Sequence, residues 1–408
     1  MSILLKNVLL DGARRDVFIL GNRFSSILPA GEYEGGADEV LDCSRKALLP
    51  PFYNAHTHAA MSLLRGWADD LPLKEWLEEH IWPREDSLTP EDIYNGTRLA
   101  ILEMIKTGTV FFSDMYFDVP ETIRAIEEMG VRAAVGVTVM DNHSKALCEE
   151  KMEFVRTWTD PTGGRIQLTM APHAIYTVGK ERLEWSAAFA RENGIRIHIH
   201  LSETEGEVRD CLREHGMSPV AYLDSLGFLG EDVVIAHGVH CSPEDIAILE
   251  KRGVGVVNCP CSNAKLSSGI FPYRNFLSSG CRLALGTDGC SSNNNLDMRE
   301  EMKTASLLAK AVGSPVDLPA ARALEMATRG GAQVFGIDAG VIEEGKLADG
   351  ILVNLDNVKM TPCHNLVSNW VYSADSSCID TVICDGRILM REGKVKGEEE
   401  ILAAVRAL

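Results

Sequence analysis

Eight short apolar runs, each followed by enough chain for a crossover helix, dominate the sequence between residues 46 and 290. Apolar runs that alternate with segments of helical periodicity are the pattern of parallel β-strands joined by helices. The helical segments include 90–106 and 121–129, where apolar positions recur every three or four residues. Eight such units in succession predict an α/β fold, a closed (β/α)8 TIM barrel. The predicted strands are 47–54, 109–115, 133–139, 166–171, 195–201, 233–237, 254–258 and 283–287.

The two chain ends follow a different pattern, with alternating strands and Gly or Asp turns. ILLKNVLLDG near the N-terminus and TVICDGRILMREGK near the C-terminus both predict β-hairpins. We expect them to pair as one small β-sandwich domain formed by residues 1–50 and 345–408, with the barrel at 51–344. A chain of 408 residues, 45% of them hydrophobic, is long enough for this arrangement. Two unrelated domains in tandem are the alternative.

The charge balance limits the partners. With 40 basic and 59 acidic residues the net charge is −19, which repels polyanions, so we expect neither nucleic acid nor an anionic membrane to bind. No apolar stretch reaches about 18 residues, and the N-terminal apolar run contains charges, so we expect a soluble protein without a targeting signal. Eleven cysteines, an odd number for a disulfide framework, favour the reducing cytoplasm.

A His-x-His pair follows the first predicted barrel strand. His56 and His58 lie two residues apart on an extended segment, so both side chains are on one face. Two imidazoles so placed suit one divalent ion, and the carboxyl end of a strand is where barrel enzymes keep their chemistry. Alone, the pair also fits two hydrogen-bonded core histidines.

Three further predicted strands end in groups that can bind a metal. They end in HIHLSE (198–203), AHGVH (236–240) and LGTD (285–288). Ligands placed by chance would scatter over strand middles, helices and loops, whereas these converge on one mouth of the barrel. The convergence predicts a metal site there. His198 and His200 have the same strand parity, so the residues alone leave the choice between them open.

This set of residues resembles the amidohydrolase superfamily, whose pattern is His-x-His after strand one, His after strands five and six, and Asp after strand eight. The resemblance implies His56, His58, His200 and Asp288 as metal ligands. Binuclear members carry a bridging lysine at the end of strand four, but here that strand reads IQLTMAPH (166–173) and has none. The expected cofactor is therefore one divalent ion, zinc first, with Fe²⁺ or Mn²⁺ as alternatives.

A closer resemblance is to the methylthioadenosine/S-adenosylhomocysteine deaminase group and, through GCSSNNNLDM, to its 5′-deoxyadenosine deaminase branch. It implies an enzyme that hydrolyses the C6–N bond of adenosine-type nucleosides, and we expect a homo-oligomer, a dimer or tetramer. The alternatives are a related hydrolase acting on a guanine, cytosine or triazine ring and a non-enzymatic scaffold, for which ligands should have been lost. The motifs are NAHTH (54–58), LRGWADDL (64–71), WPRE (82–85), HLSE (200–203), GTDG (286–289) and GCSSNNNLDM (289–298).

The deamination chemistry assigns further roles. A zinc-type ion lowers the pKa of bound water from about 15.7 toward about 7. Glu203, three residues after His200, is the expected proton shuttle to the purine N1 and the departing amine. Asp288 can accept a proton from the attacking water. His237 is expected to hold the hydroxide. Glu203 also fits a solvated loop carboxylate, as Glu205 and Glu207 nearby do, and His237 fits a core histidine. His240 is expected to be structural.

Substrate binding is predicted mostly from the resemblance. It implies Glu85 on the ribose hydroxyls and His173 at the end of strand four. Trp76 is expected to stack on the ligand, although core packing is an equal alternative, and Ser292 to hydrogen-bond the purine. Residues 133–155 contain no arginine, the residue with which relatives that favour S-adenosylhomocysteine grip its carboxylate. We therefore expect neutral groups at the ribose 5′ position.

Overall fold

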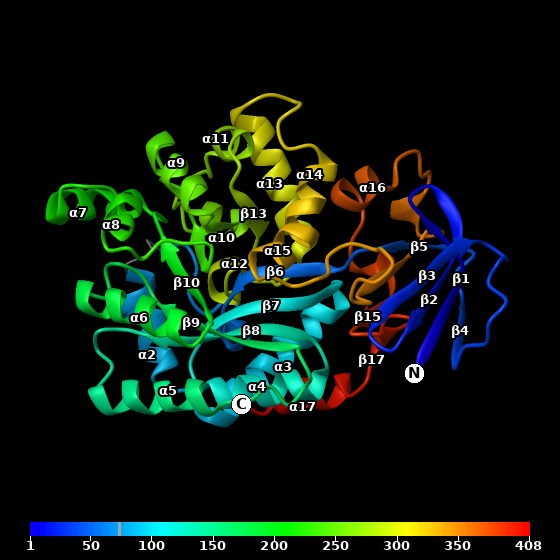
Figure 1. Cartoon of the computed structure of the whole chain (residues 1–408), viewed down its shortest axis with the longest axis horizontal. Helices are drawn as coiled ribbons and strands as arrows, with labels where there is room; N and C mark the ends of the chain where they lie inside the picture. The colour runs from blue at the N-terminus through cyan, green and yellow to red at the C-terminus, as the bar shows by residue number, and fades with distance from the viewer. Residues whose placement is uncertain (72–74) are drawn as a thin grey trace.

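The computed structural model describes residues 1–71 and 75–408, and its centre is the predicted barrel (Figure 1). Eight parallel strands pair in chain order, each with the next. Because parallel strands in sequence share one polarity, all their carboxyl ends lie at the same rim. The strands are β6 (Phe52–Thr57), β7 (Thr109–Tyr116), β8 (Arg132–Val139), β9 (Ile166–Pro172), β10 (Arg196–Leu201), β11 (Val233–His237), β12 (Gly255–Asn258) and β13 (Arg282–Leu285).

The barrel is closed by contacts between β6 and the residues that follow β13. The Asn54 side chain accepts from the Thr287 backbone N–H at 3.0 Å and donates to the Thr287 hydroxyl at 2.7 Å. The backbone N–H of Asp288 donates to the carbonyl of His56 at 3.0 Å. Gly286 lies so close that a Cβ there would be 2.8 Å from the backbone N and O of His56. The first and last strands are therefore held together beside two predicted metal ligands.

Helices surround the barrel, and the predicted segments 90–106 and 121–129 are both helical. Two of these helices begin with proline inside a capping box, formed by Thr89 with Asp92 and by Ser242 with Asp245. The helices are α3 (Pro90–Lys106), α4 (Val119–Met129), α5 (Lys145–Thr157), α6 (Lys180–Glu192), α7 (Glu205–His215), α8 (Pro219–Ser225), α9 (Pro243–Arg252), α10 (Pro260–Lys265), α11 (Tyr273–Ser278), α12 (Cys290–Asn293), α13 (Met298–Val312), α14 (Ala320–Glu325) and α15 (Gly331–Val334).

Several shorter helical segments accompany these helices. They are η1 (Ala59–Leu64), η2 (Trp76–Ile81), α2 (Trp82–Glu85) and η3 (Met326–Gly330). In the part of the chain that the structure describes, no helix combines the length and apolar character needed to cross a lipid bilayer.

A second, mostly antiparallel sheet of nine strands is built from both chain ends, as predicted, and lies to one side of the barrel (Figure 1). The two ends meet where β5 pairs with β14, with Leu48 opposite Leu352. The strands are β1 (Ser2–Leu10), β2 (Ala13–Leu20), β3 (Arg23–Pro29), β4 (Glu39–Asp42), β5 (Lys46–Leu49), β14 (Gly350–Asn354), β15 (Ile379–Cys384), β16 (Arg387–Arg391) and β17 (Lys394–Val395).

The predicted first barrel strand, 47–54, is wrong in its boundaries. The run contains two strands: Lys46–Leu49 is β5 of the second sheet, and the barrel strand β6 begins only at Phe52. Pro50 and Pro51 lie between them. A proline has no N–H to donate to a neighbouring strand, so the two prolines separate β5 from β6 within one continuous apolar run.

The C-terminal segment also contacts the barrel. It adds η4 (Val358–Met360), α16 (Leu366–Tyr372), η5 (Ser376–Cys378) and α17 (Glu398–Arg406). Helix α17 is joined to α3 by ion pairs from Arg98 to Glu400 and from Lys106 to Glu398. At the opposite end of the barrel from the strand carboxyl ends, buried Arg132 of β8 pairs with Asp349 at 2.8 Å. These contacts fix the second sheet against the barrel and leave the carboxyl-end rim uncovered by it.

Gly286→Ala tests the closure. The added methyl group must displace the His56 backbone, so we expect the free energy of unfolding to fall by about 1 to 3 kcal/mol, the usual cost of overpacking. Urea unfolding measures it. Gly36→Ala is the matched control because a Cβ there meets nothing within 4 Å. Unfolding at the wild-type urea concentration would contradict the close approach of the two strands.

Candidate metal centre and active site

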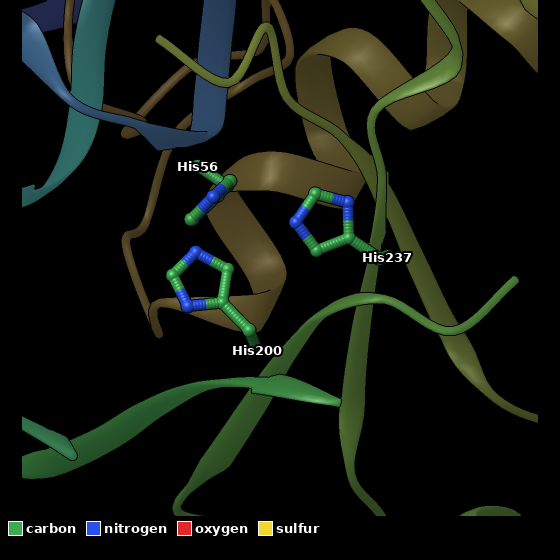
Figure 2. Close-up of side chains that lie close together, drawn as sticks. All are labelled: His56, His200 and His237. Atoms are coloured by element: carbon green, nitrogen blue, oxygen red, sulfur yellow. The ribbon is translucent and has the colours of Figure 1, made fainter. Parts of the chain in front are cut away.

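Four predicted ligand residues meet at the carboxyl-end rim. The ring nitrogens of His56, His200 and His237 lie within 4.8 Å of one another and face a common point (Figure 2). A second group with the same spacing joins His56 to His58 and Asp288. The Nε2 atom of His58 is 3.1 Å from Oδ1 of Asp288, and that of His56 is 3.4 Å away from the same oxygen. All five side chains are buried or nearly so.

Backbone carbonyls orient two of the imidazoles. Nδ1 of His58 donates to the carbonyl of Met115 at 2.6 Å, and Nδ1 of His200 donates to that of His173 at 2.8 Å. A carbonyl only accepts, so the proton of each neutral ring is on Nδ1. Each Nε2 therefore presents its lone pair to the centre, which is the arrangement that metal-binding histidines require.

The structure distinguishes His198 from His200. Nε2 of His198 lies 3.2 Å from Nδ1 of His56, and its Nδ1 lies 3.0 Å from the Ser113 hydroxyl. His198 is thus behind His56 and supports it, while His200 belongs to the group of converging rings. Parity alone could not separate the two because both point inward from β10.

A chain of amides orients His237. Its Nδ1 is 2.9 Å from Oδ1 of Asn263, whose amide donates to Oδ1 of Asn258 at 3.1 Å. The amide of Asn258 in turn donates to the Tyr273 hydroxyl at 3.0 Å. The chain fixes the Asn263 oxygen toward His237, so the ring donates from Nδ1 and its Nε2 faces the site as an acceptor.

The two carboxylate oxygens of Asp288 have different partners. Oδ1 faces the histidines, while Oδ2 accepts from the hydroxyls of Ser262 at 2.6 Å and Ser292 at 2.9 Å. The hydrogen bonds and charges of His56 and His58 keep the pKa of Asp288 well below its usual range, despite burial. Ser292 therefore lies behind Asp288 and is outside the set of residues lining the cavity. Its predicted bond to the purine stays a prediction.

Three residues at this rim have left-handed backbone angles. Ser202, His237 and Asp288 have φ values of 52°, 75° and 61°. Non-glycine residues seldom adopt this conformation, and it is concentrated at sites where function requires a particular side-chain direction. His237 ends β11, Ser202 directly follows β10 and Asp288 lies three residues after the end of β13, so the chain is bent where these strands end.

The protonation of the centre suits a divalent metal. Burial lowers the pKa of His56 to about 4 and holds that of His200 well below its ordinary value, so both rings are neutral near pH 7. Burial also opposes the charge of His58, but the bond to Asp288 outweighs it and raises the pKa to about 9, so a metal ion bound there would displace the proton from its Nε2. Nε2 of His56 is buried without a hydrogen-bond partner. Three imidazole nitrogens and one carboxylate are a donor set that fits zinc.

A cavity of about 80 Å³ opens above these groups. Glu203 lines it, with one oxygen 3.8 Å from Nε2 of His237 and the other 3.5 Å from the Ser268 hydroxyl. Burial raises the pKa of Glu203. His240, expected to be structural, donates to the Ser268 carbonyl at 2.6 Å and so holds the segment facing Glu203.

The other predicted substrate residues also line this cavity. His173, Trp76 and Glu85 are among its walls, and Trp82 lies beside them. The indole nitrogen of Trp76 donates to the carbonyl of Ala68, which fixes its ring. Burial raises the pKa of Glu85 to about 7 and lowers that of His173 to about 3.

Tyr116 is a cavity residue that the sequence analysis missed. Its hydroxyl lies beside the Glu85 carboxyl, and burial, followed by the charge of Glu85 and the hydrogen bond with it, raises the pKa of the tyrosine well above its ordinary value. A phenol and a carboxyl placed together in one cavity can serve a polar ligand that both donates and accepts. Tyr116 ends β7, so its position at a strand carboxyl end was the available signal. Other lining residues not foreseen are Thr138, Met140 and Tyr176.

The segment after β8 offers no free cation to the cavity. Lys151 donates to the carbonyl and hydroxyl of Thr138, and Arg182 of α6 donates to the carbonyls of Met140 and His143. Neither lysine nor arginine occurs among the described residues that line the cavity.

Comparisons with known proteins agree with this geometry. Residues 47–389 match the model of the amidohydrolase family. A 5-methylthioadenosine/S-adenosylhomocysteine deaminase of Syntrophomonas wolfei is 49% identical over 91% of this chain and 88% of its own length. A 5′-deoxyadenosine deaminase of Methanospirillum hungatei is 46% identical over 92% of this chain and 85% of its own. The crystal structure of an adenosine deaminase from Xanthomonas campestris with bound zinc superimposes with a TM-score of 0.93 at 33% identity, covering 100% of this chain and 97% of the other.

Glu85→Gln tests the burial of that carboxyl. The folded protein keeps the Glu85 proton to about pH 7, whereas the unfolded chain releases it near 4.5, so the wild type loses stability as pH rises between these values. Glutamine does not titrate. At pH 4.5 the free energy of unfolding of the variant should therefore nearly equal that of the wild type. At pH 8 the variant should be more stable than the wild type by up to about 3 kcal/mol. Urea unfolding at both pH values decides, with exposed Glu79→Gln as control; a pH-independent difference would contradict the prediction.

Proposed function

The chain belongs to the amidohydrolase family, and on this premise we propose that it deaminates the adenine ring of a small nucleoside by hydrolysis, giving the inosine analogue and ammonia. The observation that carries the proposal is the place of Glu203, a buried carboxyl with a raised pKa in the cavity beside His237 and above the converging ligands. The proposed substrates are 5′-deoxyadenosine, 5′-methylthioadenosine and adenosine, with S-adenosylhomocysteine used less well.

The proposed cofactor is one divalent metal ion, zinc before Fe²⁺ or Mn²⁺, held by His56, His58, His200 and Asp288. The free Nε2 atoms and the carboxylate oxygen turned toward them support this set. The absence of a lysine in β9 supports one ion instead of two. When bound, the metal supplies a water molecule activated for attack at neutral pH.

The side chains of this protein then move the protons. Glu203 donates its proton to the purine N1 as water adds to C6, while Asp288 accepts the proton that this water releases. Glu203 then takes the proton of the new C6 hydroxyl and passes it to the amine, which leaves as ammonia as the C6 carbonyl forms. The proton on Asp288 returns to Glu203. A raised pKa suits this task because the carboxyl can carry a proton near neutral pH. His237 can accept a hydrogen bond from the attacking water through Nε2, because its Nδ1 donates to the Asn263 oxygen. Asp288 has Oδ2 engaged by two serines, so only Oδ1 is available to the reacting groups.

The same cavity is suited to hold the ribose. A ribose hydroxyl donates and accepts, so it can donate to Glu85 and accept from Tyr116, which lie together in the cavity wall. Trp76 offers an indole face from a fixed position, and His173, neutral at pH 7, offers a ring edge. These contacts would place C6 of the base over the metal centre and beside Glu203.

We also propose a cytoplasmic location and assembly as a homo-oligomer. All eleven cysteines are free, which fits a reducing compartment.

An ammonia-release screen over nucleosides tests the function. We expect release from adenosine-type substrates with the absorbance change of the inosine product, and none from guanosine, cytosine or a chlorotriazine. Turnover of one of these other rings without turnover of any adenine nucleoside would overturn the proposal in favour of a related hydrolase.

Glu203→Gln should remove the proton shuttle and leave the metal in place. Glutamine has nearly the same shape but carries no ionisable proton, so we expect turnover to fall at least ~100-fold, the usual scale of general acid–base catalysis. Turnover and metal content are measured on the same preparation. Near-normal turnover with intact metal would mean that another group moves the proton.

The 5′ preference follows from the missing cation. A charge-assisted hydrogen bond contributes roughly 1.5 to 3 kcal/mol, so its lack should lower selectivity for a 5′ carboxylate by about 10-fold to 100-fold. We expect a higher kcat/KM for 5′-deoxyadenosine than for S-adenosylhomocysteine, compared on one preparation. An equal or higher value for S-adenosylhomocysteine would show that a cation reaches the site from elsewhere, such as a neighbouring subunit.

A further inference from the structure

Glu207 is a buried carboxyl that the proposed reaction does not use. It lies in the first turn of α7, where its side chain is only 7% exposed, whereas Glu205 of the same turn is exposed. A charged side chain is seldom buried so fully without a specific partner. Glu207 has no basic partner among the ion pairs of the described residues.

The partners of Glu207 are two consecutive backbone N–H groups. Oε1 accepts from Ser202 at 2.9 Å and Oε2 accepts from Glu203 at 2.8 Å. In an ordinary capping box the carboxylate at this position bonds the N–H of the N-cap residue, here Thr204. The Thr204 hydroxyl makes the usual N-cap bond and accepts from the N–H of Glu207 at 3.1 Å. Glu207, however, reaches past the N-cap and holds the two residues that leave β10.

These two residues determine where the Glu203 side chain points. Ser202 has the left-handed φ of 52°, and its carbonyl accepts from the N–H of His240 at 2.9 Å. The Glu203 carboxyl itself has weak contacts, 3.5 Å to Ser268 and 3.8 Å to His237. Its position in the cavity therefore depends on the backbone of this turn more than on contacts of its own.

We propose that Glu207 is a positioning residue, which holds the turn at Ser202 and Glu203 with both carboxylate oxygens and so aims the Glu203 carboxyl at the substrate. The proposal rests on the proposed function for the identity of that substrate. The N-terminal turn of α7 favours a negative charge at this place, which offsets part of the cost of burying it. Only a side chain with two acceptor oxygens can serve both N–H groups.

Glu207→Gln is the diagnostic variant because it preserves volume and removes one acceptor. Its amide NH₂ group would face a backbone N–H, so one of the two hydrogen bonds is lost and the turn must shift. We expect kcat for 5′-deoxyadenosine to fall about 10-fold to 100-fold, the scale for a small displacement of a reacting group, with KM nearly unchanged. Glu205→Gln makes the same change at an exposed site two residues away and should match the wild type.

A double-mutant cycle separates positioning from a general structural role. If Glu207 acts through Glu203, then Glu207→Gln should add little to the loss already caused by Glu203→Gln. If it only supports the fold, the two losses should multiply. Metal content and thermal unfolding are recorded for all variants. If Glu207→Gln does not fold, Glu207→Asp replaces it, because that side chain is one methylene too short to reach both N–H groups.

Hydrogen exchange tests the contact without any activity. Amide exchange in a peptide covering residues 199–206 should be faster in the Glu207→Gln protein than in the wild type and the Glu205→Gln control, because one of the two protected N–H groups loses its acceptor and the turn shifts. If the wild type turns over no adenine nucleoside, the proposed function fails. Hydrogen exchange would still show whether Glu207 holds the N–H groups of Ser202 and Glu203. Unchanged exchange, unchanged kcat or multiplying losses would overturn the inference.

Discussion

The meeting of β13 with β6 is the constraint on which the site depends. A parallel sheet of eight strands is a barrel only if its last strand returns to its first, and here the return is made by Asn54, Thr287 and the bond from the Asp288 N–H to the His56 carbonyl. The same bond sets His56, near the end of the first strand, beside Asp288, which follows the last strand; both are proposed metal ligands. Closure of the fold and assembly of the metal centre are therefore one event, which is why Gly286 has no room for a side chain.

Around this junction, polar groups are buried at a cost that only function offsets. Nε2 of His56 is buried without a hydrogen-bond partner at the centre, and burial raises the pKa of Glu85 in the cavity to about 7. Buried polar groups of this kind cost stability, and the proposed metal and substrate would satisfy them. Behind His237 the supporting hydrogen bonds run unbroken from Asn263 through Asn258 to Tyr273.

Much of this could be predicted from the sequence, because polar residues at the ends of apolar runs are visible as a pattern. The barrel, the second sheet from both ends and the residues that converge at the rim all follow from it. The start of the first strand could not, since the Pro50 and Pro51 boundary interrupts a run that is apolar on both sides. Glu207 was missed because nothing local distinguishes a buried polar side chain from an exposed one; only the packing of distant elements decides which it becomes. For Tyr116 the one local signal was its position at the end of β7.

The central claim is that one bound metal ion and the residues at this rim together deaminate an adenine nucleoside. The most direct measurement removes metal from the protein with a chelator and adds zinc back in small increments while ammonia release from 5′-deoxyadenosine is followed. The account predicts almost no release from the metal-free chain and a linear recovery that ends at one zinc per chain. Full activity without metal, or recovery that continues to two equivalents, would contradict it.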